Sequence, residues 1–301
     1  MNAPSLVSLV SLAAFVSLVA CSSSTPKTTP PSPAGGDGGR IHRFRIGALD
    51  AIALSDGTVS VPNDGAVFAV GHAEEAADLL ALVGMPRDEL HLSIQPLLVK
   101  ADTRVLLFDT GARDAIATAG RLPASLALAG VTPGDVTDIF ISHAHSDHVF
   151  GLVTAAGARA FPTATIHLSA PEWAALEAEE PAFAASIAAN VKPFAPGAQV
   201  LPEVLAVETR GHTAGHSSYL VGTGDDRLLY LGDVAHHTVV SLQRPAWSVA
   251  VDSDHASADA VRAQTLSRLA AAHTRVYAVH FPFPGLGHVV DQDGAFAWQA
   301  E

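Results

Sequence analysis

Between residues 40 and 110 the chain alternates short apolar runs with turn residues, a pattern typical of β-structure. Residues 97–99 and 105–108 are apolar runs on either side of a turn at 101–103, and this order predicts a β-hairpin. Ser-Asp-Gly-Thr at 55–58 separates two further apolar runs and is a predicted turn. We therefore expect the domain to begin with antiparallel strands.

The rest of the chain mixes segments of helical and strand periodicity. The expected helices cover residues 113–129, 172–190 and 257–272. The expected strands cover residues 136–141, 204–207, 218–221, 228–231 and 276–279. Strands first, then strands mixed with helices, favour an α/β fold in which helices cover sheets. No glycine-rich nucleotide-binding loop of the G-x-G-x-x-G or Walker type is present, so a doubly wound nucleotide fold is disfavoured.

The first 39 residues differ in composition from the remainder of the chain. Residues 6–20 are apolar, too short for a spanning helix and of the right length for the core of a signal peptide. They end in Leu-Val-Ala-Cys, which resembles a lipoprotein lipobox with Cys21 as the lipidated residue. Residues 22–39 are rich in Ser, Thr, Pro and Gly, as flexible tethers are.

We therefore divide the chain into a lipoprotein-type signal peptide (1–20), a flexible tether (21–39) and a single domain (40–301), because no second linker and no repeat interrupts the last part. The expected location is the periplasm, with a lipid anchor at Cys21 in the bacterial envelope. Since residues 1–4 carry no Lys or Arg, a plain secretory signal or a misplaced start codon is the alternative.

The charge of the chain excludes some functions. It has 301 residues, a formal net charge of -13 and only 17 Lys and Arg residues. Nucleic-acid binding is disfavoured, because phosphate contacts need clustered basic side chains and none cluster here. A single cysteine cannot form an intramolecular disulfide. The 15 histidines are informative mainly through their clustering.

The densest cluster is Ser-His-Ala-His-Ser-Asp-His at residues 142–148, directly after a predicted buried strand. His143 and His145 are two residues apart, so both side chains point the same way if the strand geometry continues. Asp147 and His148 come next, in a loop that can fold back. Imidazole and carboxylate are preferred zinc ligands, and a catalytic zinc takes about three of them plus an open position. Four such residues exceed the need of one catalytic zinc, which indicates two metal ions.

This H-x-H-x-D-H motif and four other segments resemble the metallo-β-lactamase superfamily. The other segments are Asp-Thr-Gly at 109–111, Gly-His-Thr-Ala-Gly-His at 211–216, Gly-Asp at 232–233, and Ala-Val-His ending at His280. Their order and spacing extend the resemblance over residues 45–290. It implies a four-layer αβ/βα sandwich, in which two mixed β-sheets are flanked by helices.

The resemblance also implies a binuclear metal centre. One metal would be bound by His143, His145 and His212, the second by Asp147, His148 and His280, and Asp233 would bridge the two. His216, the second histidine of its motif, is expected to pack or hydrogen-bond behind the ligands. Asp109 is expected either to orient a ligating imidazole or to be an ordinary turn residue. Zinc is the first expectation, with manganese, iron and cobalt as alternatives.

Such a centre implies hydrolysis. Two cations that share a carboxylate also share a water molecule, lower its pKa and provide a bridging hydroxide near neutral pH. One metal would polarise the C=O or P=O oxygen, and the other would stabilise the developing negative charge. Asp233 would accept the proton of the hydroxide and pass it to the leaving group. The substrate would be a small molecule with an ester-type bond: an aryl ester, a phosphotriester or a lactone.

Within the superfamily, residues 53–59, 251–254 and the string His-Phe-Pro-Phe-Pro-Gly-Leu-Gly-His at 280–288 are similar to methyl parathion hydrolase-like secreted hydrolases. His236 favours this branch, because acyl-homoserine-lactone lactonases often carry Tyr three residues after the bridging Asp and methyl parathion hydrolases carry His. We therefore place His236 in the pocket with a catalytic role. Related enzymes are often dimers, which implies that a homodimer can form.

Other aromatic and histidine residues receive lesser roles. Phe150 departs from the family pattern, and its ring would lie beside the metals and reshape the pocket. Phe281, Phe283 and Trp173 are candidate walls for an apolar leaving group, with core packing as the alternative for Trp173. His237 is expected at the surface. Five histidines outside every motif are expected to be surface or structural residues: His72, His91, His167, His255 and His273.

Several activities remain as alternatives. A quorum-quenching-type lactonase and a β-lactamase belong to the same superfamily. A glyoxalase II-type thioesterase is disfavoured by the 280–288 string, a nuclease by the acidic charge, and an oxygen-reducing diiron protein by His145, where that class has Glu. An alternative outside the enzymes is a non-catalytic zinc-binding lipoprotein that kept its ligands for stability. This alternative is disfavoured because all seven expected metal ligands are present.

Overall fold

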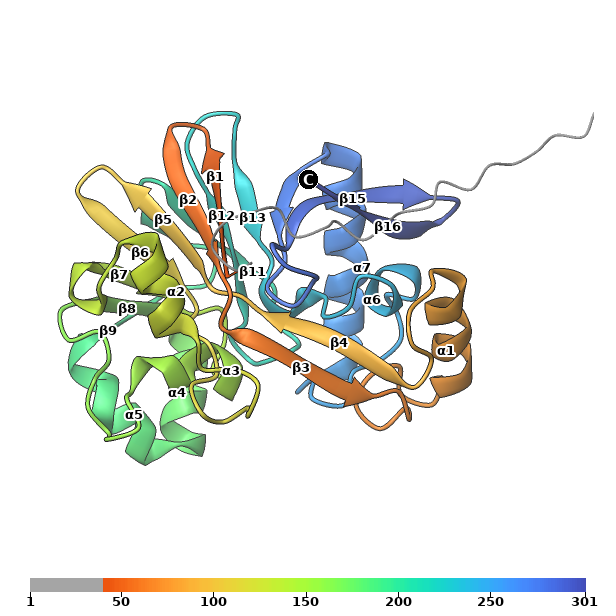
Figure 1. The fold of residues 1–301 in the computed structure, drawn as a ribbon, viewed down its shortest axis with the longest axis horizontal. Helices are drawn as coiled ribbons and strands as arrows, with labels where there is room; N and C mark the ends of the chain where they lie inside the picture. The colour runs from red at the N-terminus through yellow and green to blue at the C-terminus, as the bar shows by residue number, and fades with distance from the viewer. Residues whose placement is uncertain (1–39) are drawn as a thin grey trace, which may run out of the picture. The chain divides into compact units, whose positions relative to one another are not determined.

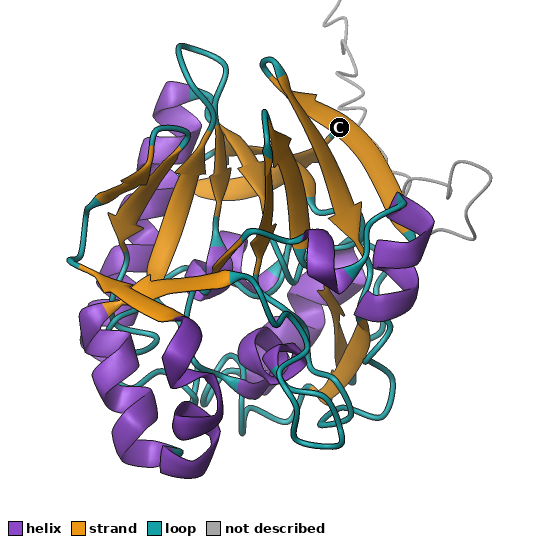
Figure 2. Cartoon of the chain, turned by 90° about the vertical axis from the view of Figure 1, so that its left-hand side faces the viewer, coloured by secondary structure: helices purple, strands orange, loops and turns teal. Residues whose placement is uncertain are grey.

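The computed structural model describes residues 40–301, which form two stacked β-sheets with helices on their outer faces (Figures 1 and 2). The predicted signal peptide, Cys21 and the tether lie outside the described residues and stay predictions. Within residues 40–301, no helix is both long enough and apolar enough to span a membrane.

The first sheet has the strand order β1-β2-β5-β6-β7-β8-β9. Its strands are β1 (Ile41–Ile46), β2 (Leu49–Leu54), β5 (Leu97–Ala101), β6 (Arg104–Phe108), β7 (Asp138–Phe140), β8 (Thr165–Ser169) and β9 (Val191–Phe194). The four strands from β1 to β6 pair antiparallel, and β6 to β9 pair parallel. The predicted hairpin of residues 97–108 is confirmed as β5 and β6.

The second sheet runs in sequence order from β10 to β16. Its strands are β10 (Gln199–Leu201), β11 (Val204–Glu208), β12 (Ser217–Val221), β13 (Leu228–Tyr230), β14 (Arg275–Tyr277), β15 (Leu286–Gln292) and β16 (Ala295–Ala300). All neighbours are antiparallel except β13 and β14, which are parallel and joined by a crossover containing the longest helix of the described residues. Both sheets are therefore mixed.

Helices cover the outer faces of the sheets. The described helices are α1 (Ala73–Leu82), α2 (Leu122–Ala129), α3 (Ser146–Val149), α4 (Ala170–Glu179), α5 (Pro181–Ile187), α6 (Val240–Gln243) and α7 (His255–Ala272), with short 3-10 turns at η1 (Pro133–Asp135), η2 (Phe150–Leu152), η3 (Ala188–Asn190) and η4 (Gly232–Val234). In Figure 1, α2, α4 and α5 lie on the side of the first sheet and α7 lies on the side of the second.

The buried apolar residues separate into layers that match this arrangement. One cluster joins the first sheet to α2, α4 and α5, through residues such as Leu107, Leu126 and Leu176. A second lies between the two sheets, and a third joins the second sheet to α7. Because each sheet buries both faces, the order of layers is helix, sheet, sheet, helix. The predicted four-layer αβ/βα fold is confirmed.

A separate two-stranded hairpin forms one wall of the cavity described in the next subsection. It consists of β3 (Gly57–Pro62) and β4 (Glu89–Ile94), paired antiparallel, with α1 between them in sequence. In Figure 1 this hairpin crosses beneath the sheets, from α3 toward α1. Its inward residues pack with Phe68, Leu80 and Val240 in a fourth apolar cluster.

Two predicted helices differ from the observed ones. The helix expected over 113–129 begins only at Leu122, because Arg113 and Gly120 have φ values of 52° and 83°, which a helix does not allow. The helix expected over 172–190 is divided into α4, α5 and η3, with Pro181 at the division. The strand expected over 136–141 is confirmed only for β7, so regular pairing ends before His143.

The irregular segment 111–121 is held by Asp56, which sequence analysis placed in a simple turn. This buried carboxylate accepts hydrogen bonds from the backbone N–H groups of Ala112 (2.9 Å), Gly120 (3.2 Å) and Leu122 (2.7 Å). Burial raises the pKa of Asp56, while these donors act in the opposite direction. A Cβ at Gly111 (φ +74) would lie 2.4 Å from the Asp56 carboxyl carbon, so this position requires glycine.

Replacing Asp56 should destabilise the fold. Asp56→Ala leaves three backbone donors without their acceptor, so we expect the free energy of unfolding to fall by roughly 1.5–3 kcal/mol. Urea denaturation followed by circular dichroism measures this change. Asp225→Ala, at an exposed position, is the control and should be neutral. Equal midpoints for the two variants would contradict the role given to Asp56.

Candidate metal centre

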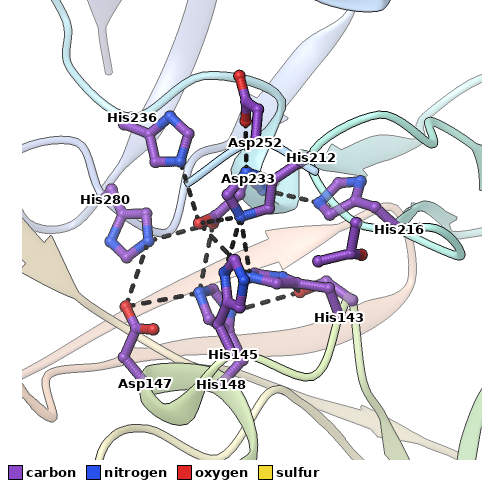
Figure 3. Close-up of polar contacts among 12 residues, drawn as sticks. His143, His145, Asp147, His148, His212, His216, Asp233, His236, Asp252 and His280 are labelled. Atoms are coloured by element: carbon purple, nitrogen blue, oxygen red, sulfur yellow. Dashed lines mark hydrogen bonds and ion pairs between the residues drawn. The ribbon is translucent and has the colours of Figure 1, made fainter. Parts of the chain in front are cut away.

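Four loops at one edge of the two sheets bring the predicted site residues together (Figure 3). The loop after β7 carries the 143–148 cluster, and the loop after β11 carries His212. The segment after β13 carries Asp233 and His236, and the segment after β14 carries His280. All eight predicted site residues converge there, from segments up to 137 positions apart in sequence (143 to 280).

The nitrogens of three histidines form the first group. His212 Nε2 lies 3.2 Å from His143 Nε2 and 3.0 Å from His145 Nδ1. The second group contains His148, His280 and Asp147, with Asp147 Oδ2 3.6 Å from the Nε2 atom of each histidine. His145 is the N-cap residue of α3 and keeps an extended conformation, so its ring still converges on that of His143 although the strand has ended.

Asp233 lies between the two groups. Its Oδ2 atom faces the first group, 3.6 Å from His143 Nε2 and 3.4 Å from His212 Nε2. Its Oδ1 atom faces the second group, 3.3 Å from His148 Nε2 and 3.1 Å from His280 Nε2. One carboxylate thus presents a separate oxygen to each set of donors, as a ligand that bridges two metal ions can.

The donor atoms fit two divalent metal ions. Among the described residues, the donor atoms within each of two sets lie within 4.8 Å of one another: His143, His145, His212 and Asp233 in one, Asp147, His148 and His280 in the other. His148 Nε2 and Asp233 Oδ1 are buried and have no hydrogen-bond partner within the described part of the chain. Small sets of mixed nitrogen and oxygen donors suit divalent ions such as zinc.

Buried carboxylates hold the ligand imidazoles from behind. Asp109 Oδ2 lies 2.7 Å from His148 Nδ1 and also accepts from Ser142 Oγ (2.7 Å) and Tyr230 Oη (2.8 Å). Of the two roles expected for Asp109, orientation of an imidazole is the one that its contacts support. A ring nitrogen bonded in this way leaves the opposite nitrogen free for a metal.

Asp252 does the same for His212, a contact that sequence analysis did not foresee. Its Oδ1 atom lies 2.7 Å from His212 Nδ1, and its Oδ2 atom accepts from the buried Arg262 (3.1 Å). Arg262 also donates to the carbonyl of Val234, next to the bridging Asp233. A buried arginine on α7 therefore links two ligand segments.

His280 and His216 have backbone partners. His280 Nδ1 lies 2.7 Å from the carbonyl of Ser93 on β4. His216 Nε2 accepts from the backbone N–H of Asp233 at 2.9 Å, so His216 lies behind the ligands as expected. Burial and the nearby His212 lower the pKa of His216 to about 3, which keeps this acceptor neutral.

The buried carboxylates of the cluster need positive charge nearby to compensate them. Burial by itself would raise the pKa of Asp233, but the surrounding histidines, His280 and His148 foremost, hold it well below its ordinary value. Burial opposes protonation of His212, yet hydrogen bonds to Asp233 and Asp252 raise its pKa to about 9. Burial and His212 together lower the pKa of His145 to about 4. The carboxylates thus require compensating cations, which either protons or metal ions can supply.

The cluster forms the floor of a cavity of about 350 Å³. Val59, Val61 and Leu92 of the β3–β4 hairpin line it, together with Val67, Phe68 and Val251. His236 also lines it: its Nε2 atom lies 3.2 Å from Asp233 Oδ2, and Phe68 packs on its ring at 5.3 Å. His236 is therefore a pocket residue, as predicted. None of the residues that line this cavity is Lys or Arg.

Several lesser expectations are wrong. Phe150 turns away from the cavity and packs against Phe183 at 5.4 Å, so it does not reshape the pocket. Phe281 is fully buried against Trp298. Phe283 and Trp173 pack on apolar clusters and do not line the cavity. None of the three is therefore a wall of the cavity, and for Trp173 the core-packing alternative is correct.

His237 is also misplaced by the sequence analysis. It is buried, 4 % exposed, and its Nδ1 atom accepts from the backbone N–H groups of Val239 and Val240 at the start of α6. Burial lowers its pKa to about 4, consistent with an acceptor role. Two adjacent histidines therefore have different roles. His236 faces the cavity, and His237 accepts hydrogen bonds from the backbone at the start of α6.

Comparison with known proteins decides the family. A sequence profile of the metallo-beta-lactamase superfamily matches residues 93–289. The chain belongs to this superfamily. Its fold and its His/Asp cluster are those of a metal-dependent hydrolase of the metallo-beta-lactamase type. No curated protein matches the chain.

Solved structures agree with this assignment. AidC, a dizinc quorum-quenching lactonase, is 29% identical, with a TM-score of 0.81 over 87% of this chain and 97% of AidC. The hydrolase AbOPH of the beta lactamase superfamily is 25% identical, with a TM-score of 0.76 and coverages of 87% and 97%. A probable metal-dependent hydrolase from Staphylococcus aureus, 18% identical with a TM-score of 0.71 over 86% and 99%, shares the fold.

Metal ions should stabilise the protein. Because the donor atoms of each group lie within 4.8 Å of one another, and His148 Nε2 and Asp233 Oδ1 have no hydrogen-bond partner among the described residues, Zn²⁺ at 100 times its dissociation constant should stabilise the fold by about 2.7 kcal/mol. Thermal unfolding with and without Zn²⁺, after chelator treatment, measures the effect. His280→Ala should reduce the shift and His255→Ala, at an exposed position outside the cluster, should keep it. An unchanged melting temperature in the parent protein would contradict the metal assignment.

Proposed function

We propose that this protein hydrolyses an uncharged ester-type substrate with an apolar substituent, using two zinc ions or similar divalent ions. His143, His145 and His212 would hold one ion, Asp147, His148 and His280 the other, and Asp233 would bridge them. The observation that carries the proposal is the position of this donor set at the floor of a cavity with apolar walls.

The walls of the cavity indicate the type of substrate. Val59, Val61 and Leu92 offer apolar surface but no cation. No Lys or Arg lines the cavity to pair with the carboxylate of a substrate such as a β-lactam. A neutral ester or lactone with an alkyl or aryl group would instead bury apolar surface against the hairpin. The β-lactamase alternative is therefore disfavoured.

Bound metal ions would polarise the substrate and lower the pKa of water. Asp233 would both hold the ions and carry a proton from the attacking water to the leaving oxygen. His236, 3.2 Å from Asp233, would place a ring N–H toward the substrate oxygen.

Two substrate classes are supported by different observations. A lactone is favoured by the similarity to AidC, a quorum-quenching lactonase crystallised with its product. An aryl ester or phosphotriester is favoured by His236 in the cavity, because the resemblance associates a His three residues after the bridging Asp with methyl parathion hydrolases. Both are neutral, fit the apolar walls and need the same metal chemistry. The alternative of a non-catalytic zinc lipoprotein gives no reason for an open cavity above the donors.

The location and assembly of the protein remain proposals from sequence. Export to the periplasm with a lipid anchor at Cys21 rests on the lipobox, and homodimer formation rests on the family resemblance.

Activity should depend on the bridging carboxylate. Metal-loaded parent protein should bind about two metal equivalents and hydrolyse at least one of a lactone, an aryl ester and methyl parathion. Asp233→Ala should lose at least one metal equivalent and reduce turnover by about 1,000-fold or more, because it removes a ligand to both ions. Metal analysis and initial rates on purified protein test this.

Asp291→Ala, an exposed acidic residue on β15, is the control and should behave as the parent. Hydrolysis of nitrocefin in preference to the neutral substrates would favour the β-lactamase alternative. Metal binding without hydrolysis of any neutral substrate would contradict the proposed activity.

The hairpin should contribute to specificity. Val61→Ala removes two methyl-sized groups from the cavity wall, so kcat/KM for long-chain esters should fall about 10-fold at roughly 0.8 kcal/mol per buried carbon. Short-chain esters should be affected less. A chain-length series of nitrophenyl esters measures the difference. Ser60→Ala, whose side chain points to the other face of the same strand, should leave the series unchanged; an equal loss for all chain lengths would contradict this role for Val61.

A further inference from the structure

One buried acidic residue near the site belongs to no ligand group. Glu172 lies in the first turn of α4 and is 1 % exposed. Among the described residues it forms no ion pair with Lys, Arg or His. In the sequence it is distinguished only as the start of a predicted helix. A buried carboxylate without a cationic partner is costly, so its contacts require an explanation.

The two oxygens of Glu172 contact two different ligand loops. Oε1 accepts from the backbone N–H of Ala144 at 2.7 Å, and Ala144 lies between His143 and His145. Oε2 accepts from Thr213 Oγ1 at 2.7 Å and from the backbone N–H of Gly215 at 2.9 Å, in the loop directly after His212. One side chain therefore connects the loops that carry all three histidines of the first group.

The start of α4 is packed tightly on the second of these loops. Ser169, the N-cap of α4, donates to the carbonyl of Gly215 at 2.6 Å and accepts from the backbone N–H of Glu172. A Cβ at Gly215 would lie 2.3 Å from the Glu172 nitrogen and from Ser169 Oγ, so only glycine fits there. The helix terminus cannot shift relative to His212 without breaking these contacts.

All three partners of the Glu172 side chain are donors. Two are backbone N–H groups and the third is a hydroxyl that donates to the carboxylate. Glutamine has almost the same shape, but its amide nitrogen would have to face either Ala144 N–H or Gly215 N–H. Aspartate is shorter by one methylene group. The contacts therefore specify glutamate rather than any polar residue of similar size.

We propose that Glu172 is a positioning residue, which fixes the distance between the 143–145 loop and the 212–215 loop so that His145 and His212 converge on one metal ion. In the structure the converging atoms, His145 Nδ1 and His212 Nε2, lie 3.0 Å apart. The inference rests on the proposed metal centre and adds to it a residue that touches neither metal nor substrate.

The two metal positions should respond differently to the loss of Glu172. The second group is oriented by other partners, Asp109 for His148 and the Ser93 carbonyl for His280. Among the described residues, the Glu172 carboxylate makes no hydrogen bond to Asp147, His148 or His280. Loss of the carboxylate should therefore weaken the metal position of His143, His145 and His212 and leave the other position close to its parent affinity.

Titration of the chelator-treated protein with Co²⁺ tests this, because the visible absorption of Co²⁺ reports the ligand geometry. Parent protein should bind two equivalents. Glu172→Gln should bind one equivalent with parent affinity and the other about 10-fold or more weakly, as found when outer partners of metal ligands are lost. Its absorption band should also change. Thr213→Val, which removes only the hydroxyl contact, should shift the same equivalent in the same direction by a smaller factor.

Two control variants on α4 separate positioning from stability. Glu177→Gln makes the same chemical change at an exposed position and should match the parent. Leu176→Ala removes a buried core side chain, so it should lower the melting temperature while keeping both cobalt affinities and the absorption band.

The outcomes are distinguishable. If the parent binds two cobalt ions and Glu172→Gln matches it in affinity and spectrum, Glu172 is not a positioning residue, although the proposed centre stands. If Leu176→Ala weakens cobalt binding as much as Glu172→Gln, the effect is one of general stability and the inference fails. Should Glu172→Gln not fold, Thr213→Val decides, and a parent-like titration of that variant overturns the inference. A parent protein that binds no metal overturns the proposed centre and this inference together.

Discussion

The interaction on which the rest of the structure depends is the burial of the Asp233 carboxylate between two groups of histidines. Its two oxygens lie 3.1–3.6 Å from five imidazole nitrogens, in surroundings with almost no solvent. Such a concentration of donors and negative charge is unfavourable in a protein interior unless cations compensate it. Two divalent ions would satisfy both groups at once. The fold then has to hold four loops in place so that the histidine nitrogens and the carboxylate oxygens converge on the two metal positions.

The layered sheets accomplish this by placing the ends of β7, β11, β13 and β14 at a common edge. The loops themselves are held by buried acidic side chains. Asp109 orients His148, Asp252 orients His212 with the help of Arg262, and we infer that Glu172 joins two loops through their backbones. Each acid accepts several hydrogen bonds, which fixes a loop more strictly than apolar packing alone would. The apolar β3–β4 hairpin completes the cavity above.

Much of this could be predicted from the sequence. The motifs at 143–148, 211–216 and 232–233, with the strand-end His280, placed every residue of the cluster, because metal ligands need particular residue types at particular spacings. The layered fold was implied by the family resemblance that the same motifs carry. The core strands β5 and β6 were also predictable, since they alternate apolar runs with a turn.

Asp109 was predicted as a possible partner of a ligating imidazole, but three other supporting acids were not predictable. Glu172, Asp56 and Asp252 act through contacts with residues distant in sequence and have no local pattern. The errors at Phe150 and His237 have the same origin: an aromatic or histidine next to a motif can point toward the site or away from it, and only packing decides. Phe150 packs on Phe183 from α5, and His237 caps α6. The predicted start of the helix at residue 113 was wrong because Asp56 holds the segment before α2 in a non-helical conformation.

The central claim is that two metal ions lie on either side of Asp233. Anomalous diffraction at the zinc absorption edge, from crystals of zinc-loaded protein, tests it most directly. The account predicts two peaks, one among His143, His145 and His212 and the other among Asp147, His148 and His280, with an oxygen of Asp233 toward each. A single peak, or peaks away from these residues, would contradict it.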